Sequence, residues 1–129
     1  MHAATSCAGQ QIRIQKEPSS LLIPVNEIGI FSCKALCTPN TCLGYWIIND
    51  SHTQHKHDYE LKGFTFHTQR NSSNDEYTLM LTVNASEAVN NTRMYCEYSG
   101  SGDNDNDIAY SMTATLLVIS SKCIPLDVY

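Results

Sequence analysis

The sequence has no apolar stretch long enough to cross a lipid bilayer, which takes about 20 residues of helix. Its longest apolar run, at residues 115–119, has the length of a single β-strand. Basic residues are also few: eight Lys and Arg stand against 13 Asp and Glu, and the formal net charge is −5. A protein that binds nucleic acid irrespective of sequence needs a basic face that displaces counterions from the phosphates. Both deficits argue against a membrane-spanning protein and against a nucleic-acid-binding protein.

The sequence also lacks the short motifs of common enzymes. It contains no Gly-x-Ser-x-Gly, no His-Glu-x-x-His and no glycine-rich phosphate loop. No His or Asp is linked by such a motif to a candidate nucleophile. We therefore expect a protein without catalytic activity and without a cofactor.

Cysteine, by contrast, is frequent. Six cysteines in 129 residues are an even number and favour an oxidising compartment. Four Asn-x-Ser/Thr sequons for N-linked glycosylation agree, and they begin at Asn49, Asn71, Asn84 and Asn90. Zinc is the alternative for the cysteines, but after Cys33, Cys37 and Cys42 no second pair follows at ligand spacing. We predict an extracellular glycoprotein domain without metal. We also expect the sequence to be a mature fragment, because the first six residues lack the apolar run of a signal peptide.

The hydrophobic pattern predicts one all-β domain. Short alternating runs are separated by turn residues, and no stretch of helical length repeats with a period of 3.6 residues. The expected strands are residues 11–15, 21–25, 27–35, 43–49, 64–68, 76–83, 92–99 and 109–120. One helical turn is expected within residues 86–91. We expect an extension at residues 1–10, a β-sandwich at 11–120 and a tail or linker at 121–129.

Four of these strands resemble the immunoglobulin superfamily. Ile-Phe-Ser leads into Cys33, Tyr45 and Trp46 follow, and Leu-Met-Leu-Thr-Val precedes a Met-Tyr that ends at Cys96. This is the Cys…Trp…Cys order of that fold. Between the two cysteines lie 62 residues (34–95), which leave room for the extra C′ strands of V-like or I-set-like domains. The resemblance implies an antiparallel two-sheet Greek-key sandwich over roughly residues 11–120.

Departures from the family pattern indicate which members of the superfamily the chain resembles. The tyrosine-corner position holds Met94, and no Phe-Gly-x-Gly segment follows Tyr110. The chain is thus unlike antibody and T-cell-receptor variable domains. It resembles the diverged domains of cell-surface receptors and adhesion proteins.

The resemblance also implies a disulfide between Cys33 and Cys96 that joins the two sheets. The remaining four cysteines allow three pairings: Cys7, Cys37, Cys42 and Cys123. We favour a Cys37–Cys42 disulfide, which closes a small loop. A disulfide from Cys7 to either Cys37 or Cys42 is the alternative. Cys7–Cys123 would exceed the distance a disulfide spans unless the termini fold back, and Cys123 can pair with a neighbouring domain or chain.

Period-2 alternation predicts which side chains face inward once Cys33 and Cys96 do. The other inward residues are Phe31, Ala35, Trp46, Ile48, Leu79, Leu81, Val83, Met94, Tyr98, Met112, Ala114, Leu116 and Val118. By the same parity Ile28 and Ile30 face outward.

Immunoglobulin-like domains usually bind through loops at one end or through the outer face of the G-F-C-C′ sheet. By parity that face contains Tyr45, Ile47 and Asn49; Arg93, Tyr95 and Glu97; Ser111, Thr113 and Thr115. Aromatic and apolar side chains beside an Arg are typical of protein interfaces, although a side loop can also cover them. We predict that Tyr45, Ile47, Arg93, Tyr95 and Glu97 bind a protein partner, which can be a second copy of the chain. Ile47→Asp is then expected to abolish binding and leave the fold intact.

Two polar segments are further candidates. Asp103, Asp105 and Asp107 alternate as in a calcium loop, but Ile108 and Ala114 occupy the positions that require Gly and Glu. This acidic loop is expected to contact a basic partner and to bind no metal. The alternative functions are a secreted immune or pathogen-binding protein that uses this loop, and a structural spacer.

The other polar segment is rich in histidine. We expect His52, His55 and His57, with Asp58, to form an exposed turn, because spacing alone cannot show the converging geometry of a metal site.

Overall fold

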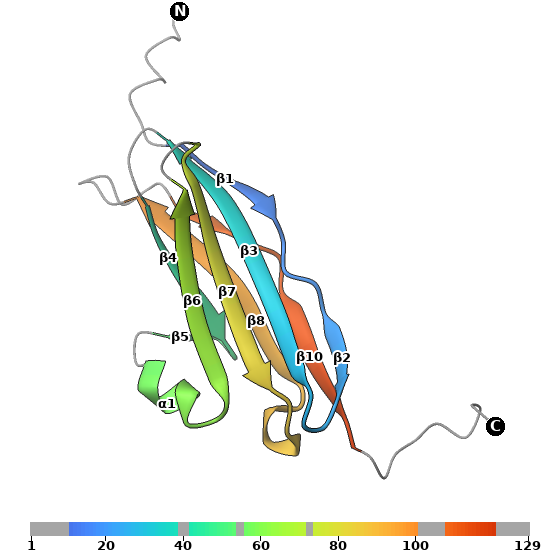
Figure 1. Cartoon of the computed structure of the whole chain (residues 1–129). Coiled ribbons are helices and arrows are strands. Elements are labelled where there is room, and N and C mark those ends of the chain that lie inside the picture. Colours follow the sequence, from blue (N-terminus) through green and yellow to red (C-terminus); the bar gives the residue numbers. More distant parts are fainter. Residues whose placement is uncertain (1–10, 39–41, 54–55, 72–73, 101–107, 121–129) are drawn as a thin grey trace, which may run out of the picture.

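The strands form a two-layered β-sandwich (Figure 1). The computed structural model describes residues 11–38, 42–53, 56–71, 74–100 and 108–120. One layer, here called the back sheet, has the strand order β1-β3-β7-β6. The other, the front sheet, has the order β2-β10-β8-β4-β5, with β9 paired to β8. The predicted all-β sandwich is confirmed.

The strand bounds lie close to the predicted ones. The back sheet comprises β1 (Gln11–Lys16), β3 (Ile28–Thr38), β7 (Glu76–Asn84) and β6 (Phe64–Asn71). The front sheet comprises β2 (Leu21–Pro24), β10 (Ala114–Ile119), β8 (Thr92–Gly100), β4 (Cys42–Ile48), β5 (Ser51–His52) and β9 (Ile108–Tyr110). All paired neighbours are antiparallel except β2 and β10, which run parallel.

Two short helices complete the described part. The 3-10 helix η2 (Glu87–Val89) lies where one helical turn was predicted, whereas α1 (Lys56–Glu60) lies in the stretch predicted to be a polar turn. None of the helices among the described residues is long and apolar enough to cross a membrane.

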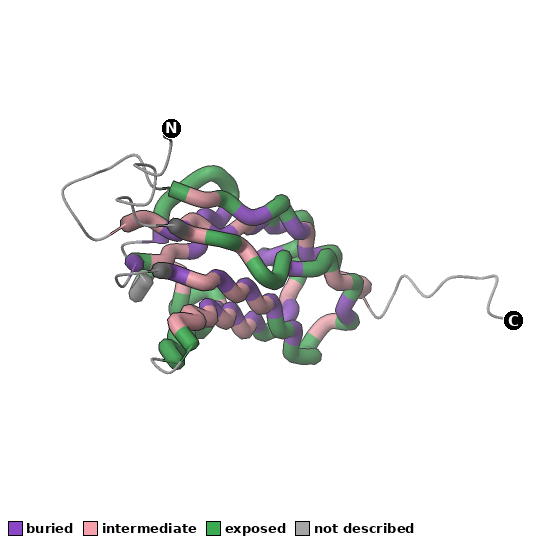
Figure 2. The backbone as a smooth tube through the Cα atoms, turned by 90° about the horizontal axis from the view of Figure 1, so that it is seen from above, coloured by how far each residue is buried: buried purple, intermediate pink, exposed green. Residues whose placement is uncertain are grey.

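The core lies between the sheets and follows the predicted alternation, which is visible as buried and exposed segments along each strand (Figure 2). Nearly all of the predicted inward side chains are buried; Val118 is half-buried and packs against the core. Ile28 and Ile30 are exposed on the outer face of the back sheet, as their parity predicts. Met112 is the exception, because it is 70% exposed.

A break in the last strand explains Met112. The hydroxyl oxygen of Ser111 accepts a hydrogen bond from the Cys96 N–H (2.8 Å), and Ser111 N–H donates to Cys96 O (2.9 Å). Just beyond, Met112 N–H donates to the Glu17 carboxylate instead of to a neighbouring strand. These contacts divide the predicted strand into β9 and β10 and turn Met112 to solvent. A hydrophobic pattern contains no information about such side-chain-to-backbone bonds.

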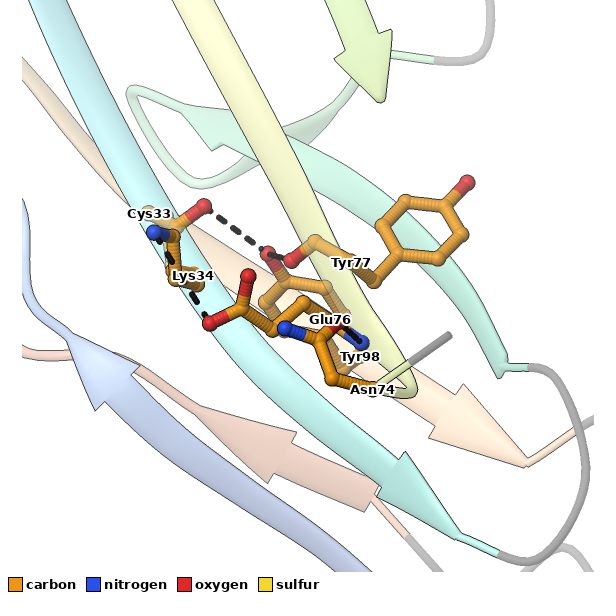
Figure 3. Close-up of polar contacts among 6 residues, drawn as sticks. All are labelled: Cys33, Lys34, Asn74, Glu76, Tyr77 and Tyr98. Carbon is orange, nitrogen blue, oxygen red and sulfur yellow. Dashed lines mark hydrogen bonds and ion pairs between the residues drawn. The ribbon is translucent and has the colours of Figure 1, made fainter. Parts of the chain in front are cut away.

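Tyr98 ties the two sheets together through its hydroxyl. This oxygen lies 3.1 Å from Cys33 O and 3.0 Å from Tyr77 O, both on the back sheet (Figure 3). The ring meets the Tyr77 ring edge-on, with centroids 5.7 Å apart. Burial raises the pKa of the Tyr98 hydroxyl, so this group stays a neutral donor.

Tyr98→Phe is expected to lower the free energy of unfolding by about 1 to 3 kcal/mol, because it leaves buried carbonyl groups without their donor. Urea denaturation measures this loss. Tyr77→Phe is the matched control: its hydroxyl points away from the group (Figure 3) and is expected to change stability by less than about 0.5 kcal/mol. Equal stability of Tyr98→Phe and the wild type would contradict a role for this hydroxyl.

Candidate functional site

A tight hairpin positions the edge of the front sheet. Asn49 and Asp50 connect β4 to β5, and both have positive φ angles (50° and 66°). Such two-residue turns match the twist of the paired strands, and Asn and Asp tolerate this conformation. The Asn49 carboxamide oxygen also accepts a hydrogen bond from Arg93 N–H (2.9 Å), which fixes the turn to β8. The hairpin therefore places His52 opposite Ile47.

Six side chains from β4, β5, β8 and β9 then share the outer face of the front sheet. Their strand register pairs Tyr45 with Glu97, Ile47 with both Tyr95 and His52, and Glu97 with Tyr110. We call this group the front cluster: Tyr45, Ile47, His52, Tyr95, Glu97 and Tyr110. Cross-strand neighbours on one face lie close enough to interact directly.

Ring contacts and one hydrogen bond connect the members of the front cluster. The Tyr45 and His52 rings lie 4.9 Å apart, and the Tyr95 and Tyr110 rings meet at 6.0 Å. His52 Nε2 lies 2.9 Å from Glu97 Oε2. The rings thus form two contacting pairs on one face, and the sequence analysis did not place two members of the cluster, His52 and Tyr110, on this face. The Asn-Asp pair was the available signal for His52, because a two-residue hairpin at this point fixes its position opposite Ile47.

Ile47 is buried, which corrects the prediction that it is an exposed contact residue. Its side chain is 4% exposed, although it does not belong to the core cluster between the sheets. Parity assigned it to the correct face. Its two cross-strand neighbours, His52 and Tyr95, are large and flank it on both sides, and parity does not reveal such covering. Within the front cluster, the exposed apolar area is consequently aromatic: Tyr110 is 56% exposed, and Tyr45 and Tyr95 are half-buried.

Charged side chains border the cluster. Arg93 is exposed on β8 and lies 3.4 Å from the Asp50 carboxylate. Both partners of this pair are largely solvated, so the pair contributes little to stability and either group is available to a partner. Arg93 and Glu97 both lie where the sequence analysis placed them.

The break between β9 and β10 leaves an open pocket beside the cluster. It is lined by Tyr95, Tyr110, Ser111 and Thr113, and its volume is about 260 Å³. Two aromatic rings and two hydroxyl groups make it suitable for a partner side chain that is apolar with a polar end.

Other candidates fall outside the described residues. Asp103, Asp105 and Asp107 of the acidic loop lie there, as do Cys7, Cys123 and His55. Within the part of the chain that the structure describes, no group of three or more His, Cys, Asp or Glu residues is placed to hold a metal ion.

The described cysteines form two pairs. Cys37 and Cys42 are joined by a disulfide between the end of β3 and the start of β4, the pairing that the sequence analysis favoured. Cys33 and Cys96 are buried opposite each other as free thiols in hydrogen-bond contact, so the structure lacks the implied bond between them. Burial is the main cause that raises the pKa of the Cys96 thiol. The Cys33–Cys96 disulfide stays a prediction.

The four sequon asparagines are exposed. Asn49 lies at the edge of the front cluster, while Asn90 accepts a hydrogen bond from Val118 N–H (2.8 Å). Asn71 and Asn84 end β6 and β7 on the outer face of the back sheet, where they pair with Glu76 and Ile28. Their occupancy stays a prediction.

Comparison with known proteins identifies the architecture. Neither family models nor curated proteins match the sequence. Among solved structures, Rst D1-D2 matches with a TM-score of 0.61 and 16% identity over 85% of this chain, which spans 50% of the Rst chain. Dpr2 Ig1-Ig2, in a complex with DIP-Theta Ig1-Ig3, matches with a TM-score of 0.58 and 17% identity over 85% of this chain and 32% of that chain. Titin domain I10 matches over 84% of this chain and 99% of its own, with a TM-score of 0.55 and 16% identity. With its sheet order and its Cys-Trp-Cys core, the chain has the immunoglobulin fold.

Proposed function

We propose that the chain is an extracellular recognition and adhesion module of a cell-surface receptor, which binds a protein partner through the front cluster and Arg93. The partner can be a second copy of the chain. The observation that carries this proposal is that Tyr45, Tyr95 and Tyr110 lie with Ile47 on the outer face of three neighbouring strands of the front sheet. The structural match to Dpr2 in its complex with DIP-Theta supports binding between immunoglobulin-fold domains.

The physical case for binding rests on the composition of this face. Tyr and Arg dominate the energetically important positions of protein interfaces, because they bury a large area and retain a polar group that can hydrogen-bond. Here two tyrosines border an open pocket, and Arg93 and Glu97 provide charges of opposite sign. Several weak contacts of this kind become effective on a membrane, where many copies bind together.

The outer face of the back sheet is less suited to binding a protein than the front cluster is. It contains the sequons of Asn71 and Asn84 at the ends of two strands. A glycan at either position is bulky and well solvated, and it would hinder close approach by a protein. The front cluster has one sequon at its edge, Asn49, and none at its centre.

Tyr110→Arg is expected to weaken binding at least tenfold and to leave the free energy of unfolding within about 0.5 kcal/mol of the wild type. The side chain is already 56% exposed, so the change removes contact area without disturbing the core. Sedimentation equilibrium over a wide concentration range measures self-association. Beads coated with many copies of the domain, applied to cultured cells, measure binding to other surface proteins.

Gln69→Arg is the matched control, because it adds the same charge at an exposed position on the back sheet. It is expected to bind as the wild type does. Loss of binding in Gln69→Arg with retention in Tyr110→Arg would overturn the assignment of the front cluster. A monomer throughout, with no cell binding by the wild type, would contradict the adhesion role itself.

A further inference from the structure

The outer face of the back sheet exposes two isoleucines at one end of β3. Ile28 is 65% exposed and Ile30 is 54% exposed, and they lie two residues apart on the same face. Exposed neighbouring aliphatic side chains on a strand favour aggregation unless something covers them. In the described residues, this part of β3 pairs with β7 alone, since β1 pairs only with Lys34 and the residues after it.

The sequon residue Asn84 lies directly beside these isoleucines. It is the cross-strand partner of Ile28, and the neighbouring pair, Ala85 and Glu27, is joined by a backbone hydrogen bond of 2.9 Å. Asn84 directs its own N–H away from β3, to Gly63 O on the β6 side (3.0 Å). Ile28 and Asn84 therefore form a non-hydrogen-bonded pair, the kind in which opposite side chains come closest.

The Asn84 side chain is free to carry a sugar that contacts the two isoleucines. The Asn84 side chain is exposed and has no hydrogen-bond partner within the described residues. Ile30 lies on the diagonal from Asn84, about 7 to 8 Å away for such positions, and the residue of β7 directly opposite Ile30 is Thr82. A sugar ring on the Asn84 carboxamide nitrogen would begin at Ile28 and extend over this aliphatic surface.

We propose that an N-linked glycan on Asn84 covers Ile28 and Ile30 and keeps this edge of the back sheet from associating with other chains. The inference rests on the proposed extracellular location, because the modification takes place in the secretory pathway. A bond forms between Asn84 Nδ2 and C1 of N-acetylglucosamine. The bond between that C1 and the pyrophosphate of a lipid-linked oligosaccharide breaks, and Nδ2 loses one proton. The glycan shields its own domain and leaves the front cluster as the open face.

The test uses the chain secreted from cultured animal cells. The mass of the intact protein and of its peptides gives the occupancy of Asn84. An anilinonaphthalene sulfonate dye, whose fluorescence reports exposed apolar surface, and light scattering against concentration measure the shielding. We expect Asn84 to be occupied, the wild type to bind little dye, and Asn84→Gln to bind severalfold more and to aggregate at lower concentration.

Three further variants isolate the glycan. Ser86→Ala destroys the same sequon and retains Asn84; because the Ser86 side chain makes no capping hydrogen bond to η2, this change should reproduce Asn84→Gln. Adding Ile28→Gln and Ile30→Thr to Asn84→Gln should restore the low dye signal, because both replacements are polar at exposed positions. Gln is used at position 28 because Thr there would complete a new sequon that begins at Asn26. Ser73→Ala removes the Asn71 sequon on the same face and should leave the dye signal unchanged.

Two results would overturn the inference: an unoccupied Asn84 in the secreted wild type, or equal dye binding by the wild type, Asn84→Gln and Ser86→Ala. The same rise in Ser73→Ala as in Ser86→Ala would also overturn it, because the shielding would then be general. None of these results depends on binding through the front cluster, so failure of the shielding is distinguishable from failure of the adhesion proposal.

Discussion

Refolding the reduced chain under oxidising conditions is expected to join Cys33 to Cys96 and to raise the free energy of unfolding by about 4 kcal/mol. The two residues lie on β3 and β8, in opposite sheets, and their thiols already touch in the core. A bond between positions so far apart in the sequence removes much of the conformational freedom of the unfolded chain. This is why the expected gain exceeds that of the short Cys37–Cys42 loop.

The order of events matters for this bond. Burial raises the pKa of the Cys96 thiol, and the thiolate is the species that attacks an oxidant. In the folded, reduced domain Cys96 is therefore expected to react slowly with oxidised glutathione. The bond should form rapidly only while the sandwich is still open.

The measurement compares two routes to the oxidised protein. Oxidised glutathione is added either to the folded reduced domain or to the chain during refolding, and peptide masses after alkylation identify the bonded cysteines. Urea denaturation then compares each product with a variant that combines Cys33→Ala and Cys96→Ala and retains Cys37–Cys42. Free Cys33 and Cys96 after oxidative refolding would contradict the prediction, and so would equal stability of the two proteins.

Much of the fold follows from local alternation of hydrophobic residues. Phe31, Leu81 and Met94 occupy inward positions because a strand repeats every two residues and one face of each sheet is buried. Alternation also assigned Ile47 to the outer face and Ile28 to the outer face of the other sheet. These features depend only on neighbours along the chain, so the sequence contains them.

The parts that were not predicted depend on contacts between distant segments. Ser111 interrupts the last strand because its side chain bonds to Cys96 across the sheet, and a hydrophobic pattern cannot show this bond. His52 joined the candidate site only after the hairpin had set it opposite Ile47. The extent of burial on an outer face likewise depends on the size of cross-strand neighbours, and so the exposure of Ile47 was predicted wrongly.

Ile47→Asp is accordingly expected to destabilise the domain by at least about 3 kcal/mol, because it places a carboxylate at a buried site whose register partner His52 is already bonded to Glu97. Urea denaturation measures this loss. Ile47→Val, which keeps the position apolar, is expected to cost about 0.5 to 1.5 kcal/mol. An Ile47→Asp protein as stable as the wild type would show that the side chain reaches solvent and that the aromatic cover opens readily.

Binding measurements distinguish the two roles within the front cluster, packing by Ile47 and partner contact by Tyr110. Ile47→Val should bind with unchanged affinity, because the partner would meet the more exposed side chains of Tyr95 and Tyr110 and not the buried side chain of Ile47. Ile47→Asp should lose binding only in step with its unfolded fraction, measured by circular dichroism under the same conditions, whereas Tyr110→Arg should lose binding while fully folded. If Ile47→Val weakens binding as strongly as Tyr110→Arg at equal folded fraction, Ile47 itself contacts the partner. The rings must then move aside on binding, since the free domain leaves only 4% of Ile47 exposed.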